Sequence, residues 1–237
     1  SDVCSSDLMM NKSRSLIATQ FHPEVHHTKD GLKMLENFLF KIANCQPNWT
    51  AGNFINEQIE KIRNFVGDGS VLTGVSGGVD STVVAALLHK AVGSRSHAVI
   101  IDHGLMRKNE VSECVDALAD GLGVNIHAYD ESKIFLSKLK GVVDPEKKRK
   151  IIGNQFIYSF DRIAMSLGKI EFLAQGTLYP DKIESGVSKG NTSHVIKSHH
   201  NVGGLPENMQ FKLVEPLDEL FKDEVRKVGK ELGLPSK

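Results

Sequence analysis

The stretch VLTGVSGGVDSTVVAALLHKA, Val71–Ala91, decides the expected fold. Its apolar start, Val71–Val75, predicts a buried strand, and Ser81–Val92 predicts a helix that begins almost at once. The polar segment between them, SGGVDS, contains two glycines that allow a tight turn and a close approach of a ligand to the backbone. Because free N–H groups at the start of a helix attract anions, this stretch predicts a phosphate-binding loop between a strand and a helix.

The side chains of this loop predict metal-assisted phosphate binding. The hydroxyls of Ser76, Ser81 and Thr82 add donors, whereas Asp80 would repel a phosphate unless it held Mg²⁺, which in turn holds phosphates. The loop has no lysine at the position that a Walker A motif requires, so that class of nucleotide site is excluded. A glycine-rich turn that binds nothing is the alternative, and the complete SGGVDS segment between strand and helix argues against it.

In the rest of the chain, short apolar runs typical of strands alternate with longer segments that have helical spacing of apolar residues. Alternation of strands and helices predicts an α/β fold, a doubly wound parallel sheet with helices on both faces. Further strands are expected at Ala98–Ile101, Asn125–Tyr129 and Glu171–Ala174, and helices at Glu110–Leu122, Lys147–Leu167 and Glu219–Leu232. The polar stretch Gly176–Pro206 predicts a functional loop or lid.

The N-terminal fifth of the chain lacks this regular alternation of strands and helices. Residues 1–15 are polar and aperiodic, and we expect a disordered or artefactual leader there. Leu16–Phe21 is partly strand-like, Leu32–Ile42 has helical spacing, and CQPNWTAGN is typical of a linker. Phe54–Val66 then predicts an amphipathic helix.

Composition narrows the function classes. The 29 basic and 29 acidic residues balance, so no overall charge favours nucleic acid or an anionic membrane. The longest apolar run, Val83–Leu88, is too short to span a bilayer, and the N-terminus has no signal-peptide core. Three scattered cysteines without C-x-x-C spacing favour a reducing, cytoplasmic location over disulfides or a zinc site.

The SGGVDS loop resembles the signature SGGxDS of the PP-loop ATP pyrophosphatases, which cleave ATP between its α- and β-phosphates to adenylate a substrate. Further segments resemble the GMP synthetase family in order from Thr19 to Pro235, with His103 standing where Asn is more usual. These segments are IIDHGLMRKNE, DPEKKRKIIGNQFI, LAQGTLYPDKIES, IKSHHNVGGLPE and KLVEPLDELFKDEVRKVGKELGLP. The resemblance implies ATP and Mg²⁺ as cofactors, XMP and glutamine-derived ammonia as further substrates, and a homodimer.

The resemblance also assigns roles to single residues. It implies an adenine pocket, pyrophosphate binding by the loop from Ser76 to Thr82 including Val79, and Mg²⁺ at Asp80. The adenine pocket would be formed by Gly74, Val75, Ile101 and Phe156, although a buried strand Ile is more often plain core.

Three residues of the later segments would be catalytic. Asp181 and Glu184, three apart, would bind Mg²⁺ or polarise ammonia, and Lys197 would close on the α-phosphate. A solvated acidic face is the usual explanation of two such carboxylates, and the resemblance to the family reverses that preference here. The last helix carries a charge cluster, Lys222, Asp223 and Arg226, which an exposed surface explains equally well.

Upstream, QFHPEV resembles the end of a class I glutamine amidotransferase, which implies His22 as general base and Glu24 as the group that orients it. No cysteine here lies in the G-x-C-x-G context of the nucleophile. We therefore expect an amidotransferase remnant at residues 16–46, a synthetase domain at 47–237, and no C-terminal dimerisation domain. The alternatives are another amidating or thiolating PP-loop enzyme and an ATP-binding but inactive fragment.

Overall fold

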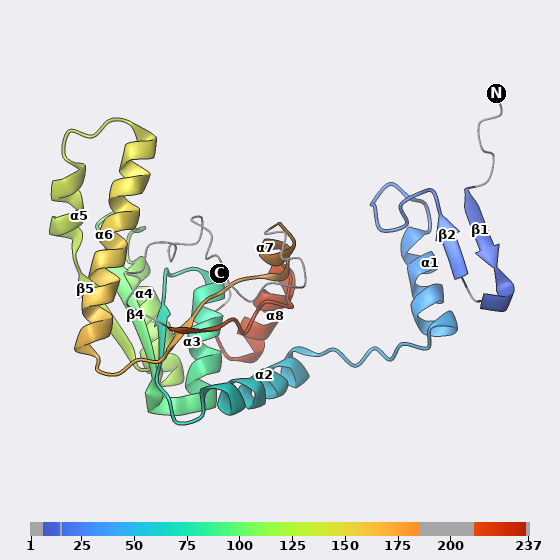
Figure 1. Cartoon of the computed structure of the whole chain (residues 1–237), viewed down its shortest axis with the longest axis horizontal. Coiled ribbons are helices and arrows are strands. Elements are labelled where there is room, and N and C mark those ends of the chain that lie inside the picture. The colour runs from blue at the N-terminus through green and yellow to red at the C-terminus, as the bar shows by residue number, and fades with distance from the viewer. Residues whose placement is uncertain (1–6, 15, 185–210, 236–237) are drawn as a thin grey trace. The chain divides into compact units, whose positions relative to one another are not determined.

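The computed structural model describes residues 7–14, 16–184 and 211–235, and for Glu184 its backbone only. The chain divides into two compact units, residues 1–49 and 50–237 (Figure 1). No helix among the described residues has both the length and the apolar character needed to cross a bilayer. The predicted candidate site lies almost entirely in the second unit.

The first unit is a hairpin followed by a helix. Strands β1 (Leu8–Asn11) and β2 (Leu16–Thr19) pair antiparallel, with Leu8 opposite Thr19. Helix α1 (Gly31–Glu36) continues into a π-helical segment, η2 (Asn37–Ile42). The expectation of an unstructured leader is wrong for Leu8–Asn11, because the apolar residues Leu8, Met9 and Met10 extend along β2 and satisfy their backbone groups there.

The second unit is built on a five-stranded sheet in which every neighbouring pair is parallel, so the α/β expectation is confirmed. The strand order is β5-β4-β3-β6-β7, which leaves β3 at the centre of the sheet. The strands are β3 (Val71–Gly74), β4 (Ser96–Asp102), β5 (Ile126–Asp130), β6 (Phe172–Ala174) and β7 (Lys212–Val214).

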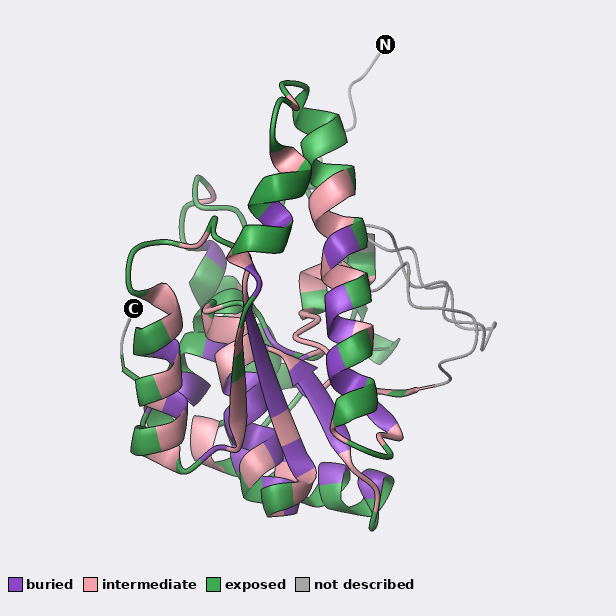
Figure 2. Ribbon diagram, turned by 90° about the vertical axis from the view of Figure 1, so that its left-hand side faces the viewer, coloured by how far each residue is buried: buried purple, intermediate pink, exposed green. Residues whose placement is uncertain are grey.

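Helices cover both faces of this sheet (Figures 1 and 2). One face packs on α2 (Ala51–Val66), α3 (Val79–Val92), α4 (Glu110–Val115) with its extension η4 (Asp116–Asp120), and α8 (Lys222–Glu231). The other packs on α5 (Ser132–Leu139) and α6 (Pro145–Ser166). The short helix α7 (Tyr179–Glu184) follows β6.

Strand periodicity explains the two cores. Successive side chains of a strand point to opposite faces, so Val71 packs with the α3 side and Leu72 with the α6 side. The middle of helix α3 is apolar on every side, and Val83–Leu88 are at most 1% exposed, because the sheet, α2 and α8 all contact the helix. The start of α3, which carries the SGGVDS loop, is therefore held rigidly at the end of the central strand.

Local capping sets the helix boundaries. Thr50 precedes α2, and its hydroxyl accepts a hydrogen bond from the Asn53 amide at 3.1 Å. Asp144 caps α6 in the same way, with Oδ1 2.7 Å from the Lys147 amide and proline as the first helical residue. Helix α6 is in turn fixed to α5 by Glu131, which is 4% exposed and accepts hydrogen bonds from Ser159 and Arg162.

Candidate active site

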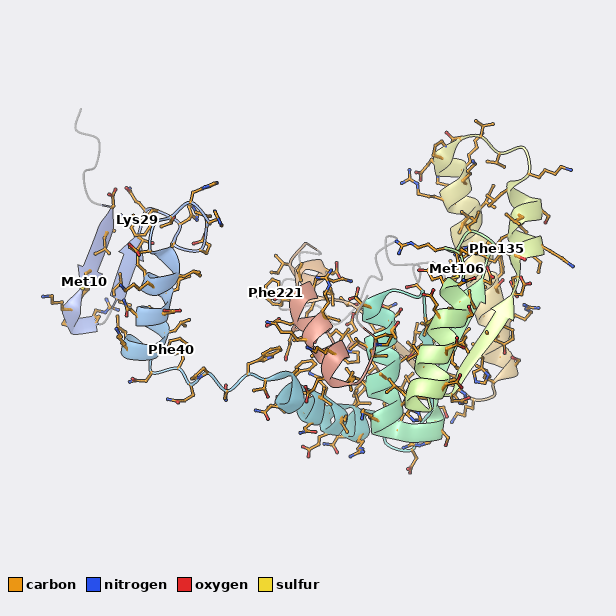
Figure 3. The ribbon with its side chains drawn as sticks, turned by 180° about the vertical axis from the view of Figure 1, so that it is seen from behind. Met10, Lys29, Phe40, Met106, Phe135 and Phe221 are labelled. Carbon is orange, nitrogen blue, oxygen red and sulfur yellow. The ribbon has the colours of Figure 1, made fainter. Side chains whose placement is uncertain are left out.

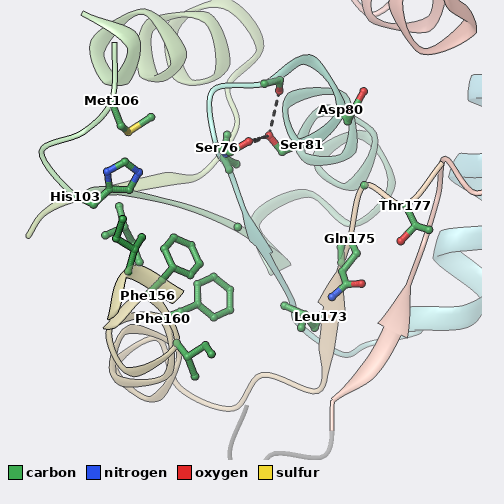
Figure 4. Close-up of a pocket in the computed structure, with 18 residues that line it drawn as sticks. Ser76, Asp80, Ser81, His103, Met106, Phe156, Phe160, Leu173, Gln175 and Thr177 are labelled. Atoms are coloured by element: carbon green, nitrogen blue, oxygen red, sulfur yellow. Dashed lines mark hydrogen bonds between the residues drawn. The ribbon is translucent and has the colours of Figure 1, made fainter. Parts of the chain in front are cut away.

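A pocket of about 450 Å³ lies at the carboxyl ends of β3, β4 and β6 (Figure 4). This is the edge at which ligands bind in open parallel sheets. The pocket is apolar on the α6 side and polar at the SGGVDS loop. Its lining residues are Gly74, Val75, Ser76, Gly78, Asp80, Ser81, Ile101, His103, Met106, Ile152, Phe156, Ile157, Phe160, Leu173, Ala174, Gln175, Gly176 and Thr177.

The hydroxyls of the loop hold its own shape. Ser81 Oγ accepts from the Ser76 amide and donates to the Gly78 carbonyl, both at 3.1 Å, and Thr82 Oγ1 donates to the same carbonyl at 2.8 Å. These side chains therefore preorganise the turn, whereas the sequence reasoning treated them only as ligand donors. Gly77, Val79 and Thr82 line a separate, small pocket of about 30 Å³ beside Cys114.

Two glycines lie where a side chain would be crowded. Gly77 has φ +77°, and a Cβ there would lie 2.8 Å from Glu110 Cγ. A Cβ on Gly176, just after β6, would lie 3.2 Å from Asp80 Cβ and 3.6 Å from the Ser81 nitrogen. The loops after β3 and β6 thus touch across the pocket, and the Gly-Gly pair and the later QGT segment belong to one cradle.

Asp80, the predicted metal ligand, forms a bidentate ion pair. Lys222 Nζ from the start of α8 lies 2.7 Å from Asp80 Oδ1 and 2.5 Å from Oδ2. Among the described residues, no group of three His, Cys, Asp or Glu side chains gathers to hold a metal. One carboxylate, serine hydroxyls and a phosphate-binding loop nevertheless fit Mg²⁺, which commonly uses one or two carboxylates together with substrate phosphates.

All four residues predicted to surround adenine line the pocket: Gly74, Val75, Ile101 and Phe156. Ile101 is 3% exposed and belongs to the core on the α6 side as well. The ring of Phe156 stacks on that of Phe160, with centroids 6.0 Å apart and planes 15° apart. The result is a flat apolar wall that fits a planar heterocycle.

Of the other residues predicted to be catalytic in the second unit, the structure describes the side chain of Asp181 alone. Asp181 Oδ2 accepts a hydrogen bond from the Leu178 amide at 2.9 Å, which stabilises the first turn of α7. Glu184 ends the same helix, but its side chain lies outside the described residues, as does all of Lys197. Of these three, only the Asp181 carboxylate has a described environment, and it does not line the pocket.

Sequence reasoning missed several pocket residues that follow β6 directly. Gln175 Nε2 is buried and has no hydrogen-bond partner among the described residues. Thr177 Oγ1 donates to Glu215 at 2.5 Å, which connects β6 to the segment after β7. Their signal was available, because residues just beyond the carboxyl end of a parallel strand are expected to face the ligand crevice.

The first unit brings His22 and Glu24 together. His22 Nδ1 lies 2.7 Å from Glu24 Oε1, and both side chains are mostly exposed. A backbone N–H, together with the hydrogen bond from His22, lowers the pKa of the Glu24 carboxyl. A carboxylate held on one ring nitrogen fixes the tautomer of the imidazole, which is the arrangement expected of an oriented base.

The fold and loop define the class of protein: the second unit has the PP-loop ATP pyrophosphatase fold. A family model described as NAD synthase matches residues 50–156. The ammonia-dependent NAD synthetase of Campylobacter jejuni superposes with a TM-score of 0.58 at 15% identity, covering 78% of this chain and 75% of the other. The U34-tRNA thiolase of Methanococcus maripaludis superposes with a TM-score of 0.54 at 21% identity, covering 80% and 67%. At these identities the likeness concerns the fold alone.

The sequence relatives are more specific, and the resemblance to GMP synthetases is confirmed. The glutamine-hydrolysing GMP synthase of Teredinibacter turnerae is 56% identical over 224 residues, 94% of this chain and 43% of its own length. That of Bacillus cytotoxicus is 53% identical over 235 residues, 99% of this chain and 45% of its own length. The class-I glutamine amidotransferase model matches residues 3–42. The chain thus spans less than half the length of these relatives.

Proposed function

We propose that this chain carries the ATP pyrophosphatase part of a glutamine-hydrolysing GMP synthase. The reaction begins when the C2 oxygen of XMP attacks the α-phosphate of ATP, which gives adenylyl-XMP and pyrophosphate. Ammonia derived from glutamine then displaces AMP and leaves GMP. The observation that carries the proposal is the 53–56% identity to GMP synthases over nearly the whole chain.

The lining of the pocket supports the first step of the proposed reaction. Adenine fits the apolar wall of Gly74, Val75, Ile101 and Phe156, and the N–H groups of the SGGVDS loop would hold the pyrophosphate. Asp80 would hold Mg²⁺, which would supply positive charge to the leaving pyrophosphate. Because the loop is already fixed by its own serine hydroxyls, little reorganisation is needed when charge develops there.

The remaining predicted residues receive roles in adenylation, in amination and in the supply of ammonia. Asp181 and Glu184 would polarise ammonia or add to the metal site, and Lys197 would neutralise the α-phosphate. The His22–Glu24 pair would act as the oriented base of a glutaminase whose nucleophile is a cysteine. The proposal therefore includes a division into an amidotransferase segment at residues 16–46 and a synthetase domain at 47–237.

Assembly and location complete the proposal. A homodimer is inferred from the resemblance to GMP synthetases. A cytoplasmic location is favoured by the cysteine pattern, and neither of the two cysteines that the structure describes, Cys45 and Cys114, forms a disulfide with the other.

The test is pyrophosphate release from Mg·ATP and ammonium with different acceptors. It is best made in the chain itself and in a chimera in which the chain replaces the matching segment of the Teredinibacter turnerae relative. We expect release in the chimera with XMP and not with deamido-NAD or citrulline. Release with another acceptor would retain the PP-loop chemistry but overturn XMP as the substrate, and release with none would favour a nucleotide-binding segment without turnover.

A further inference from the structure

The ion pair between Asp80 and Lys222 joins the phosphate loop to the last helix of the described chain. Lys222 is the first residue of α8 and lies 142 positions from Asp80 in the sequence. Its ammonium contacts both carboxylate oxygens, at 2.7 and 2.5 Å, so that both are engaged at once. The Asp80 side chain is 28% exposed and that of Lys222 is 45% exposed, so solvent weakens the pair but does not surround it.

Lys222 is held in this position by the start of its helix. Glu224 Oε2 accepts a hydrogen bond from the Phe221 amide at 2.8 Å and closes the first turn of α8. Phe221 is labelled in Figure 3, and its ring packs edge-on against that of Tyr179 of α7, with centroids 5.4 Å apart. Helix α8 also packs along α3, the helix that carries Asp80. The lysine is therefore positioned by tertiary structure and not only by its attraction to the carboxylate.

The ion pair sets the charge that the pocket presents to a ligand. Asp80 is the only acidic residue among the described residues that line the pocket. An isolated carboxylate at a phosphate loop would repel an incoming nucleotide, and the ammonium of Lys222 offsets that repulsion. The same ammonium contacts both oxygens that a divalent cation would use, so lysine and metal compete for one carboxylate.

We propose that Lys222 keeps free divalent cations off Asp80, so that the metal binds there together with the nucleotide rather than before it. The inference rests on the proposed function, because it requires a nucleotide whose phosphates reach this loop. When the metal arrives with a nucleotide, the phosphates supply further ligands to the metal and a new anionic partner for the ammonium. Displacing Lys222 then costs less than it does for the bare cation.

The experiment measures binding of Mn²⁺ alone to the full chain, without nucleotide, from the electron paramagnetic resonance signal of the free ion. Removing the competing ammonium in Lys222→Met or Lys222→Gln should tighten Mn²⁺ binding by about threefold to tenfold, the range for a half-exposed bidentate pair. Lys222→Arg, which restores a cation, should return the affinity to that of the wild type. Lys230→Met removes a lysine from the exposed end of the same helix and should change nothing.

The gain should depend on Asp80. In Asp80→Asn/Lys222→Met the carboxylate that the metal would use is gone, so the tighter Mn²⁺ binding should disappear. The proposal is wrong if Lys222→Met and Lys222→Gln bind Mn²⁺ no more tightly than the wild type, or if the gain survives loss of the Asp80 carboxylate. Failure of the proposed function would instead appear as absent XMP-dependent pyrophosphate release, a result that leaves the Mn²⁺ comparison intact.

Discussion

In the proposed function, Asp80 is the residue on which the chemistry of the pocket most depends. It supplies the carboxylate of the loop, pairs with Lys222 and packs closely against Gly176. Its position at the start of α3 followed from the sequence, because the strand, loop and helix are contiguous. Its partner did not, because contact between residues 142 positions apart requires the sheet to place α8 beside α3.

Replacing Asp80 by Asn should weaken binding of Mg·ATP by at least about tenfold, because the metal loses its only carboxylate from the pocket. Binding of ATP without metal should change much less or improve, since a negative charge is removed. Calorimetric titration with and without Mg²⁺ measures both. Asp223→Asn, which alters a mostly exposed carboxylate on α8, is the matched control. An unchanged ratio between the two affinities would refute the metal role of Asp80.

Glu131 is a buried residue whose ion pair should contribute to the stability of the fold. Its carboxylate is buried against Ser159 and the guanidinium of Arg162, whose own side chain is 66% exposed. Arg162→Met should destabilise the fold by about 1–3 kcal/mol, because it leaves a buried charge without its cation. Glu131→Gln/Arg162→Met should cost less than the sum of the two single changes. Urea unfolding gives all three values, and strict additivity would show that the pair is not coupled.

Strands β4 and β5 meet in a histidine pair, His97 and His127. The rings stack with centroids 5.6 Å apart, and Asn125 Nδ2 lies 3.2 Å from His97 Nδ1. Burial lowers the pKa of both imidazoles, and for His97 the nearby His127 lowers it further. Protonation of either ring is therefore easier in the unfolded chain than in the folded one.

The histidine pair should make the stability of the fold depend on pH. Below the ordinary histidine pKa of about 6.5 the unfolded chain binds more protons, so stability falls as the pH drops towards the folded-state values. The loss should be visible between pH 7.5 and pH 5.5 in urea unfolding, and His97→Gln/His127→Gln should reduce it. His26→Gln, at an exposed histidine, should retain the slope of the wild type. An equal slope in the double variant would assign the pH dependence to other groups.

Among the helices and strands, the sequence predicted the long elements better than the short ones. The helices α2, α3 and α6 and the strands β3 to β6 lie where periodicity and turn residues indicated them. Helix α5 and strand β7 were missed, because eight and three residues are too few to establish a period. Contacts such as Gly176 against Asp80 were also beyond sequence reasoning, since they depend on which strands become neighbours.

For the whole molecule, the division after Trp49 predicts independence of the second unit. The buried hydrophobic residues of the described chain all lie between Phe54 and Leu234. Residues 50–237 alone should therefore unfold in one cooperative transition, with a midpoint close to that of the complete chain, and should bind Mg·ATP with affinity within about twofold of it. Thermal unfolding and calorimetry test both. Loss of cooperativity on removal of residues 1–49 would show that the first unit contributes to the core.

The central position of β3 determines when its two edges can be paired while the chain is being translated. Strand β4 follows β3 soon and can pair with one side of it, but β6, its other neighbour, is translated only after α6 is complete. A nascent chain that ends within α6 therefore has an unpaired edge on β3, the strand that becomes the centre of the sheet. Because Gly176 also comes after that point, the cradle around Asp80 closes late, and the proposed nucleotide site is complete only after β6 has left the ribosome.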